Sequence, residues 1–114
     1  MIVKLSKEYS LGSKKYKEIN LDLEGMTGLT LIEAEREYYT RNKNSMIKEL
    51  EYGWYLTVAS ESSGIKYGDF LKLNARDCVK IVNAVRGFLQ STDSEEIEEA
   101  EVVETLGSIE QKRY

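Results

Sequence analysis

The stretch YKEINLDL, residues 16–23, alternates polar and apolar side chains from its glutamate onward. Its apolar members Ile19, Leu21 and Leu23 recur at every second position, which is the period of a β-strand with one buried face. A preceding strand is expected over residues 2–9, and the glycine that follows it can adopt the positive φ of a tight turn. The sequence therefore predicts an N-terminal β-hairpin with one apolar face.

The hairpin needs a partner for its apolar face. A two-stranded hairpin is at best marginally stable alone, so we expect helices, or strands of another subunit, to cover this face. Lys14, Lys15 and Lys17 crowd its second arm. We interpret these lysines as protection of an exposed strand edge, with a basic patch that faces a partner as the alternative.

Two helices are expected directly after the hairpin. The first covers residues 31–41, with Thr30 as the N-cap of a capping box that Glu33 completes. The second begins with Ser45 as its cap and ends near residues 62–64, where a glycine suits the left-handed position after a helix. The hydrophobic periodicity of both segments predicts one apolar face on each helix.

A third helix is expected from Ala75 to Leu89, with Asn74 as its N-cap and Asp77 completing a box-like start. Its apolar positions spread too widely for a one-sided surface helix. We interpret it as the central, most buried helix, or as one with a second face for a partner.

Gly53 costs the second helix about 1 kcal/mol relative to alanine and is interpreted as a close helix crossing, with a kink as the alternative. Asp69 is expected to cap a short helical turn before the third helix.

Charge divides the chain into two segments. Residues 91–114 carry eight acidic and two basic side chains, whereas residues 1–90 carry twelve acidic and fourteen basic ones. We therefore expect one domain over residues 1–90 and an acidic, mobile C-terminal tail over residues 91–114, with a short helix near residues 94–105. The predicted fold class is α+β: an N-terminal β-hairpin followed by three helices and the acidic tail.

The composition disfavours several classes of function. The 114 residues include no histidine and a single cysteine, Cys78, so the usual base that activates a thiol nucleophile is missing. The carboxylates lack metal-ligand spacing, and no glycine-rich run follows a strand in the phosphate-binding pattern. We therefore assign no catalytic, metal or cofactor residue, and we expect no enzyme activity.

Nucleic acid and membrane are also disfavoured as partners. The net charge of −4 opposes binding to phosphate backbones. No apolar run approaches the roughly 20 residues that cross a bilayer. The single cysteine, without a signal peptide, is typical of a reducing cytoplasmic setting.

The aromatic residues point toward protein binding. Tyrosine and tryptophan are enriched at protein interfaces because each has a large apolar body and a polar tip. Alternatively, most of them line the edge of the core with the hydroxyl group in water, and the sequence favours neither interpretation. The candidate protein-binding residues lie on the two middle helices and are Tyr38, Tyr39, Tyr52, Trp54 and Tyr55.

Five segments, taken in order, resemble one protein family. INLDLEGMTG at 19–28, followed by LIEAE at 31–35, resembles the N-terminal signature of phage tail assembly chaperones. These small proteins are encoded just before the tape measure protein in long-tailed phages and prophages. LNARDC at 73–78 and VNAVRGFL at 82–89 are similar to the C-terminal helix of that family, as VKLSK at 3–7 is to its opening.

The resemblance implies a function by binding, without an active site. Such chaperones bind the long, helical tape measure protein in the cytoplasm of the bacterial host, help to recruit tube subunits, and leave before the tail is complete. The expected partners are the tape measure protein, the tail tube protein as a further candidate, and other copies of the chain.

Two other functions stay open at this point. One is a structural tail-completion or virion component, which would remain in the particle. The other is a small regulatory DNA-binding protein or antitoxin. For the latter, residues 75–89 offer only Arg76, Lys80 and Arg86 as contacts, which is few for a recognition helix.

Overall fold

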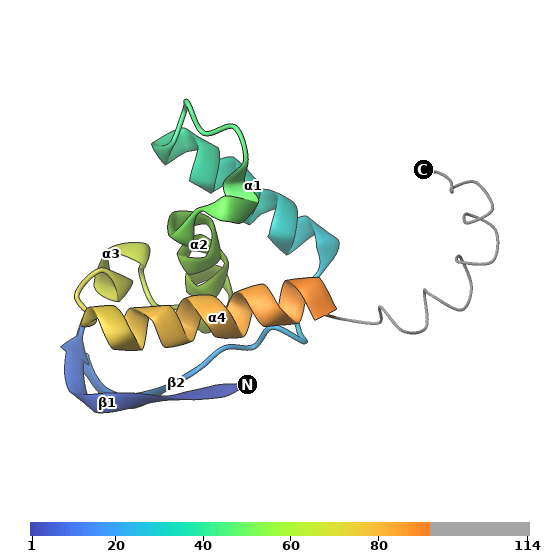
Figure 1. Ribbon diagram of the computed structural model, residues 1–114. Coiled ribbons are helices and arrows are strands. Elements are labelled where there is room, and N and C mark those ends of the chain that lie inside the picture. The colour runs from blue at the N-terminus through green and yellow to red at the C-terminus, as the bar shows by residue number, and fades with distance from the viewer. Residues whose placement is uncertain (92–114) are drawn as a thin grey trace.

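The computed structural model describes residues 1–91, which form an α+β fold with an N-terminal antiparallel hairpin followed by helices (Figure 1). In chain order the elements are β1 (Ile2–Leu11), β2 (Lys14–Asn20), α1 (Gly28–Arg41), the 3₁₀ turn η1 (Lys48–Leu50), α2 (Tyr52–Ser63), the single-turn helix α3 (Tyr67–Phe70) and α4 (Ala75–Ser91). The predicted fold class is confirmed, with α1, α2 and α4 as the three long helices. The predicted acidic tail beyond Ser91, including the short helix near 94–105, lies outside the described residues.

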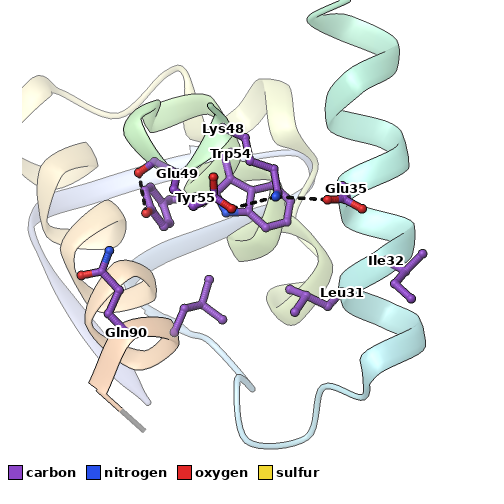
Figure 2. Close-up of a pocket in the computed structure, with 9 residues that line it drawn as sticks. Leu31, Ile32, Glu35, Lys48, Glu49, Trp54, Tyr55 and Gln90 are labelled. Carbon is purple, nitrogen blue, oxygen red and sulfur yellow. Dashed lines mark hydrogen bonds and ion pairs between the residues drawn. The ribbon is translucent and has the colours of Figure 1, made fainter. Parts of the chain in front are cut away.

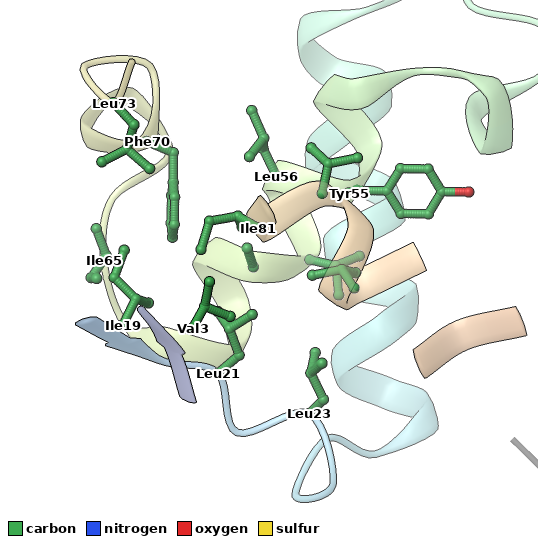
Figure 3. Packing of buried hydrophobic residues seen from close by; sticks show 14 of the residues in the cluster. Val3, Ile19, Leu21, Leu23, Tyr55, Leu56, Ile65, Phe70, Leu73 and Ile81 are labelled. Carbon is green, nitrogen blue, oxygen red and sulfur yellow. The ribbon is translucent and has the colours of Figure 1, made fainter. Parts of the chain in front are cut away.

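The hairpin lies along one side of α4 and α1 lies on the other side, while α2 passes behind α4 in this view (Figure 1). The end of α2 reaches the segment after the hairpin, where the Asp22 amide donates to the carbonyl oxygen of Ser62 at 3.0 Å. Ile19, Leu21 and Leu23 are at most 2% exposed, so the predicted apolar face is confirmed. Strand β2 ends at Asn20, but Leu21 stays fixed because its amide donates to the carbonyl of Met1 at 2.8 Å. Figure 3 shows these side chains on the side of the hairpin where α2 and α4 pack.

A bulge interrupts the pairing of the two strands. Pairing is regular at both ends of the hairpin, which closes through Gly12 at a φ of 66°. Between the pairs Lys4–Glu18 and Tyr9–Tyr16, however, residues 5–8 of β1 lie opposite a single residue of β2. Such an excess releases backbone groups from the ladder, so they need partners elsewhere.

Asp77 supplies those partners from the first turn of α4. Its carboxylate accepts the amide of Ser6 at 3.0 and 3.1 Å, the hydroxyl of Ser6 at 2.8 Å and the hydroxyl of Tyr9 at 2.7 Å. Asn74 is the predicted cap and accepts the Asp77 amide at 2.8 Å. Asp77 does not complete a capping box as predicted, because the Asn74 amide donates to Tyr9 instead. The fully buried carboxylate thus ties the bulge to α4.

The predicted N-caps Thr30 and Asp69 are wrong. Helix α1 begins a turn earlier than expected, because Thr27 is extended and its hydroxyl oxygen accepts the Thr30 amide at 3.2 Å. With its amide bonded there, Thr30 does not form the predicted box with Glu33. Asp69 lies inside α3, where it pairs with Lys72 at 3.1 Å, although the short helix itself was predicted correctly.

Helix α2 begins later than predicted. Ser45 does not cap it, because the Ser45 hydroxyl donates to Glu51 at 3.2 Å within the loop between α1 and α2. Ile47 and Leu50 have helical spacing, but they are 55% and 77% exposed and join no buried stripe. Periodicity alone therefore extended the predicted helix into a segment that has no core to pack against.

Two glycines lie at the ends of α2, and Gly64 behaves as predicted. Gly64 ends the helix in the left-handed conformation at a φ of 80°. Gly53 lies in the first turn, and a Cβ there would lie 3.3 Å from Tyr67 Oη and 3.4 Å from Tyr38 Cε1. Both neighbours are side-chain atoms, from α1 and α3, so the predicted close helix crossing at Gly53 stays a prediction.

The most buried helix is α2, so the prediction that the third helix is the most buried is wrong. All six residues of 54–59 are buried, because α2 packs against both α1 and α4. Helix α4 buries one stripe through Ile81, Val82 and Val85. Five other apolar residues of α4 are only partly buried, so a second, partner-facing side of α4 stays a prediction; they are Cys78, Val79, Ala84, Phe88 and Leu89.

No helix within residues 1–91 is long and apolar enough to cross a membrane.

Candidate protein-binding groove

The five aromatic residues predicted to bind protein do not form one exposed surface. Tyr38, Trp54 and Tyr55 are at most 4% exposed and belong to the core, which favours the structural interpretation for these three. The Tyr38 ring meets the rings of Tyr39 and Trp54 edge-on, at centroid distances of 5.4 and 6.0 Å. Tyr39 is half-buried and Tyr52 is 50% exposed, so only these two can offer substantial surface to a partner.

Trp54 and Tyr55 nevertheless border a surface groove (Figure 2). The groove has a volume of about 370 Å³. Because Trp54 and Tyr55 are almost fully buried, they form its floor. The walls come from three other elements: Leu31, Ile32 and Glu35 of α1, Lys48 and Glu49 of η1, and Leu89 and Gln90 of α4.

Hydrogen bonding and packing fix the floor of the groove. The Tyr55 hydroxyl donates to the carbonyl oxygen of Glu49 at 2.7 Å, which holds η1 against α2. The ammonium group of Lys48 lies 5.1 Å from the centroid of the Trp54 ring, within the range of a cation–π contact. Figure 2 shows Leu31 directed into the space beside Trp54, with Ile32 on the outer side of α1.

The rim of the groove carries two carboxylates and one ammonium group. Lys48 Nζ lies 3.1 Å from Glu35 Oε2 and 2.8 Å from Glu49 Oε2. Hydrogen bonding to Glu49 and Glu35 raises the pKa of Lys48, and the same bond to Lys48 lowers the pKa of Glu49. The Lys48 side chain is 14% exposed, whereas those of Glu35 and Glu49 are 42% and 58% exposed. The rim therefore presents a net negative charge to solvent.

An exposed apolar segment adjoins the groove. Met46, Ile47, Leu50 and Tyr52 are 89%, 55%, 77% and 50% exposed, and we name residues 46–52 the apolar loop. The loop is continuous with the groove, because Lys48 and Glu49 belong to both. Clustered exposed apolar side chains are typical of a binding surface.

Sequence reasoning missed this loop because it placed Ile47 and Leu50 on the buried stripe of a helix. A usable signal was present in the preceding asparagines and serine of residues 42–45, which interrupt helical structure. Apolar residues just after such a break have no regular element to bury them.

The other reactive or ionisable groups in residues 1–91 do not form a recognisable site. Burial, and then the neighbouring carboxylate of Glu37, raise the pKa of Glu61, while burial raises the pKa of the Cys78 thiol. A raised pKa makes the thiolate scarcer and the cysteine less reactive. Within this part of the chain no three histidine, cysteine or carboxylate side chains gather where they could hold a metal ion.

The chain matches no known family model, no curated protein and no solved structure. Support for a function therefore comes from the groove, the apolar loop and the resemblance of residues 1–90 to the family described in the sequence analysis.

Proposed function

We propose that this protein is a tail assembly chaperone that binds the tape measure protein of a long-tailed phage or prophage in the cytoplasm of the bacterial host. The observation that carries the proposal is the groove with the apolar loop beside it, which together leave apolar surface uncovered on a folded domain. The ordered resemblance of five segments within residues 1–90 to that family supports it independently.

The physical logic is helix-in-groove recognition. A long helical protein exposes apolar stripes until other subunits cover it, and an apolar groove can shield one stretch of such a stripe from water. Side chains at the groove floor are already ordered, so binding costs little additional conformational entropy there. The exposed loop adds area without disturbing the core.

The proposed activity is binding without covalent chemistry. The sequence has no histidine, and its single cysteine is partly buried with a raised pKa. The tail tube protein remains a further candidate partner. Self-association would cover the same apolar surface when the client is absent.

Co-expression tests the proposal. The tape measure protein from the same genome is expressed with and without this chain, and an unrelated helical protein of similar length serves as the control client. We expect the chain to co-purify with the tape measure protein and to increase its yield in the soluble fraction. Equal yield in both cases, without co-purification, would overturn the proposal.

The composition of mature particles separates a chaperone from a structural component. A chaperone leaves before the tail is complete, so mass spectrometry of purified particles should not find this chain. Its presence at a stoichiometry similar to that of other tail proteins would favour the structural alternative.

The geometry of α4 gives little support to DNA binding. Lys80 Nζ donates to the carbonyl oxygen of Lys4 at 3.1 Å, and the Arg86 guanidinium lies 5.2 Å from the Tyr55 ring centroid. Of the three basic side chains on this helix, two are thus engaged within the domain. A recognition helix needs several side chains free to reach base edges.

A further inference from the structure

We infer that the groove binds an amphipathic helix whose apolar stripe is flanked by lysine or arginine. The inference rests on the proposed function, because the helix would belong to the client, and it adds the surface and the charge by which the client is recognised. Three features carry it: an apolar floor, an acidic rim and an adjoining apolar loop.

The apolar part of the groove suits a helix stripe. Trp54 and Tyr55 form the floor, and Leu31 of α1 and Leu89 of α4 line the walls. Anchors three or four residues apart on a helix lie on one face, so successive side chains could occupy the groove and then reach the apolar loop. Occupation that reaches the apolar loop would remove the exposed side chain of Leu50 from water.

The charge of the rim selects the flanks of that helix. Glu35 and Glu49 approach Lys48 from opposite sides (Figure 2), and one ammonium group cannot neutralise both carboxylates. Both carboxylates are substantially exposed, whereas Lys48 is largely covered. A lysine or arginine beside the apolar stripe would therefore gain an opposite charge, while a glutamate there would meet a like charge.

The acidic tail of the same chain is a poor occupant by this criterion. Residues 92–114 carry eight acidic and two basic side chains, so their net charge is negative and the negative rim repels it. The charge complementarity instead favours a basic client segment.

Trp54 provides a direct readout, because it is the only tryptophan of the chain and lies at the groove floor. Two synthetic peptides of about 18 residues, five helical turns, share one leucine stripe and contain no tryptophan or tyrosine. One carries lysine beside the stripe and the other carries glutamate. We expect the lysine peptide to change Trp54 emission saturably in the full-length protein, and to bind at least about tenfold more tightly than the glutamate peptide.

Groove variants locate the binding. Leu31→Glu places a charge on the wall, and Ile32→Glu places one at the more exposed outer edge, where folding is less at risk. The matched control is Leu71→Glu, since Leu71 is 60% exposed and does not line the groove. We expect both groove variants to weaken binding of the lysine peptide about tenfold or more, and the control to bind like the wild type.

A charge reversal tests the role of the rim. In the double variant Glu35→Gln with Glu49→Gln, Lys48 loses both carboxylates and the rim becomes positive. The preference should then shift from the lysine peptide to the glutamate peptide. Circular dichroism and thermal unfolding verify that each variant is folded.

Three results would overturn the inference. The first two are equal binding of both peptides by the wild type and unchanged binding of the lysine peptide by folded Ile32→Glu. The third is a wild-type dimer that persists in excess lysine peptide and becomes a monomer in the Ile32→Glu variant. The last result would assign the groove to a second copy. Failure of the proposed function gives a different pattern, in which the lysine peptide binds at the groove but the tape measure protein does not. Conversely, undiminished co-purification with Ile32→Glu would preserve the proposed function and reject the groove.

Discussion

Asp77 shows how one side chain can position two elements that are distant in the sequence. Burial alone would raise its pKa, but hydrogen bonds from Tyr9 and Ser6, with Lys80 nearby, lower the pKa below its ordinary value. The ionised carboxylate therefore stabilises the bulge of β1 against the start of α4. The sequence indicated that Asp77 belongs to a helix start, but no local pattern could show that its partners lie about 70 residues earlier.

Removal of this carboxylate should destabilise the fold. In Asp77→Ala the Ser6 amide and the Tyr9 hydroxyl lose a buried acceptor, and we expect the free energy of unfolding to fall by about 3 kcal/mol. Chemical denaturation monitored by circular dichroism measures the loss. Asn83→Ala, on an exposed part of the same helix, is the control and should change stability by less than about 0.5 kcal/mol. Similar midpoints for the two variants would refute the role of Asp77.

The contribution of Asp77 should depend on pH in a defined direction. A carboxyl group with a lowered folded-state pKa stabilises the protein fully above its unfolded-state pKa, near 3.8, and loses this contribution as the pH falls through the folded-state value. The stability difference between wild type and Asp77→Asn should therefore be constant near neutral pH and shrink below pH 3.8. A difference that grows on acidification would contradict this assignment.

Glu61 should behave in the opposite way. Its folded-state pKa is raised by partial burial and by Glu37, so its ionised form disfavours the folded state above the ordinary pKa of 4.5. Glu61→Gln should therefore raise stability near neutral pH, by about 0.3 kcal/mol because the site is exposed to solvent. The gain should vanish below pH 4.5. Denaturation midpoints of wild type and Glu61→Gln, measured at neutral pH and below pH 4.5, test this. A variant less stable than the wild type at neutral pH would count against it.

Among the elements, hairpin and helices differ from the apolar loop in how far sequence patterns predict them. Three features follow from local sequence patterns and are present in the structure: the apolar face of the hairpin, Gly64 at the C-terminal end of α2, and the Asn74 cap of α4. The start of α1 could not be decided, because Thr27 and Thr30 are equally good caps one turn apart. Tertiary packing decides such cases, since local cap preferences are nearly equal.

The apolar loop should contribute to binding and very little to stability. In the double variant Met46→Ser with Leu50→Ser, both replaced side chains are already mostly exposed, so the free energy of unfolding should change by less than about 0.5 kcal/mol. Co-purification of the tape measure protein should nevertheless decrease clearly. A large loss of stability would show that the loop is structural, and unchanged co-purification would exclude it from the binding surface.

At the scale of the whole molecule, the aromatic residues around α2 have two roles: they fill the core, and they form the floor of the groove. Tyr38, Trp54 and Tyr55 consolidate the core around this helix, while the groove exists only because α1, η1 and α4 converge beside it. Sequence patterns placed the aromatic residues on the correct elements. They could not show which faces those elements would bury, because that depends on contacts between segments far apart in the chain.

Hydrogen–deuterium exchange on the complex with the tape measure protein tests the central claim most directly, because it reports which part of this domain the client covers. We predict slower exchange, relative to the free protein, in the apolar loop, in the first half of α1 and in the last turn of α4, with the hairpin unchanged. Protection confined to β1 and β2, or no protection in a verified complex, would contradict binding through the groove and the apolar loop.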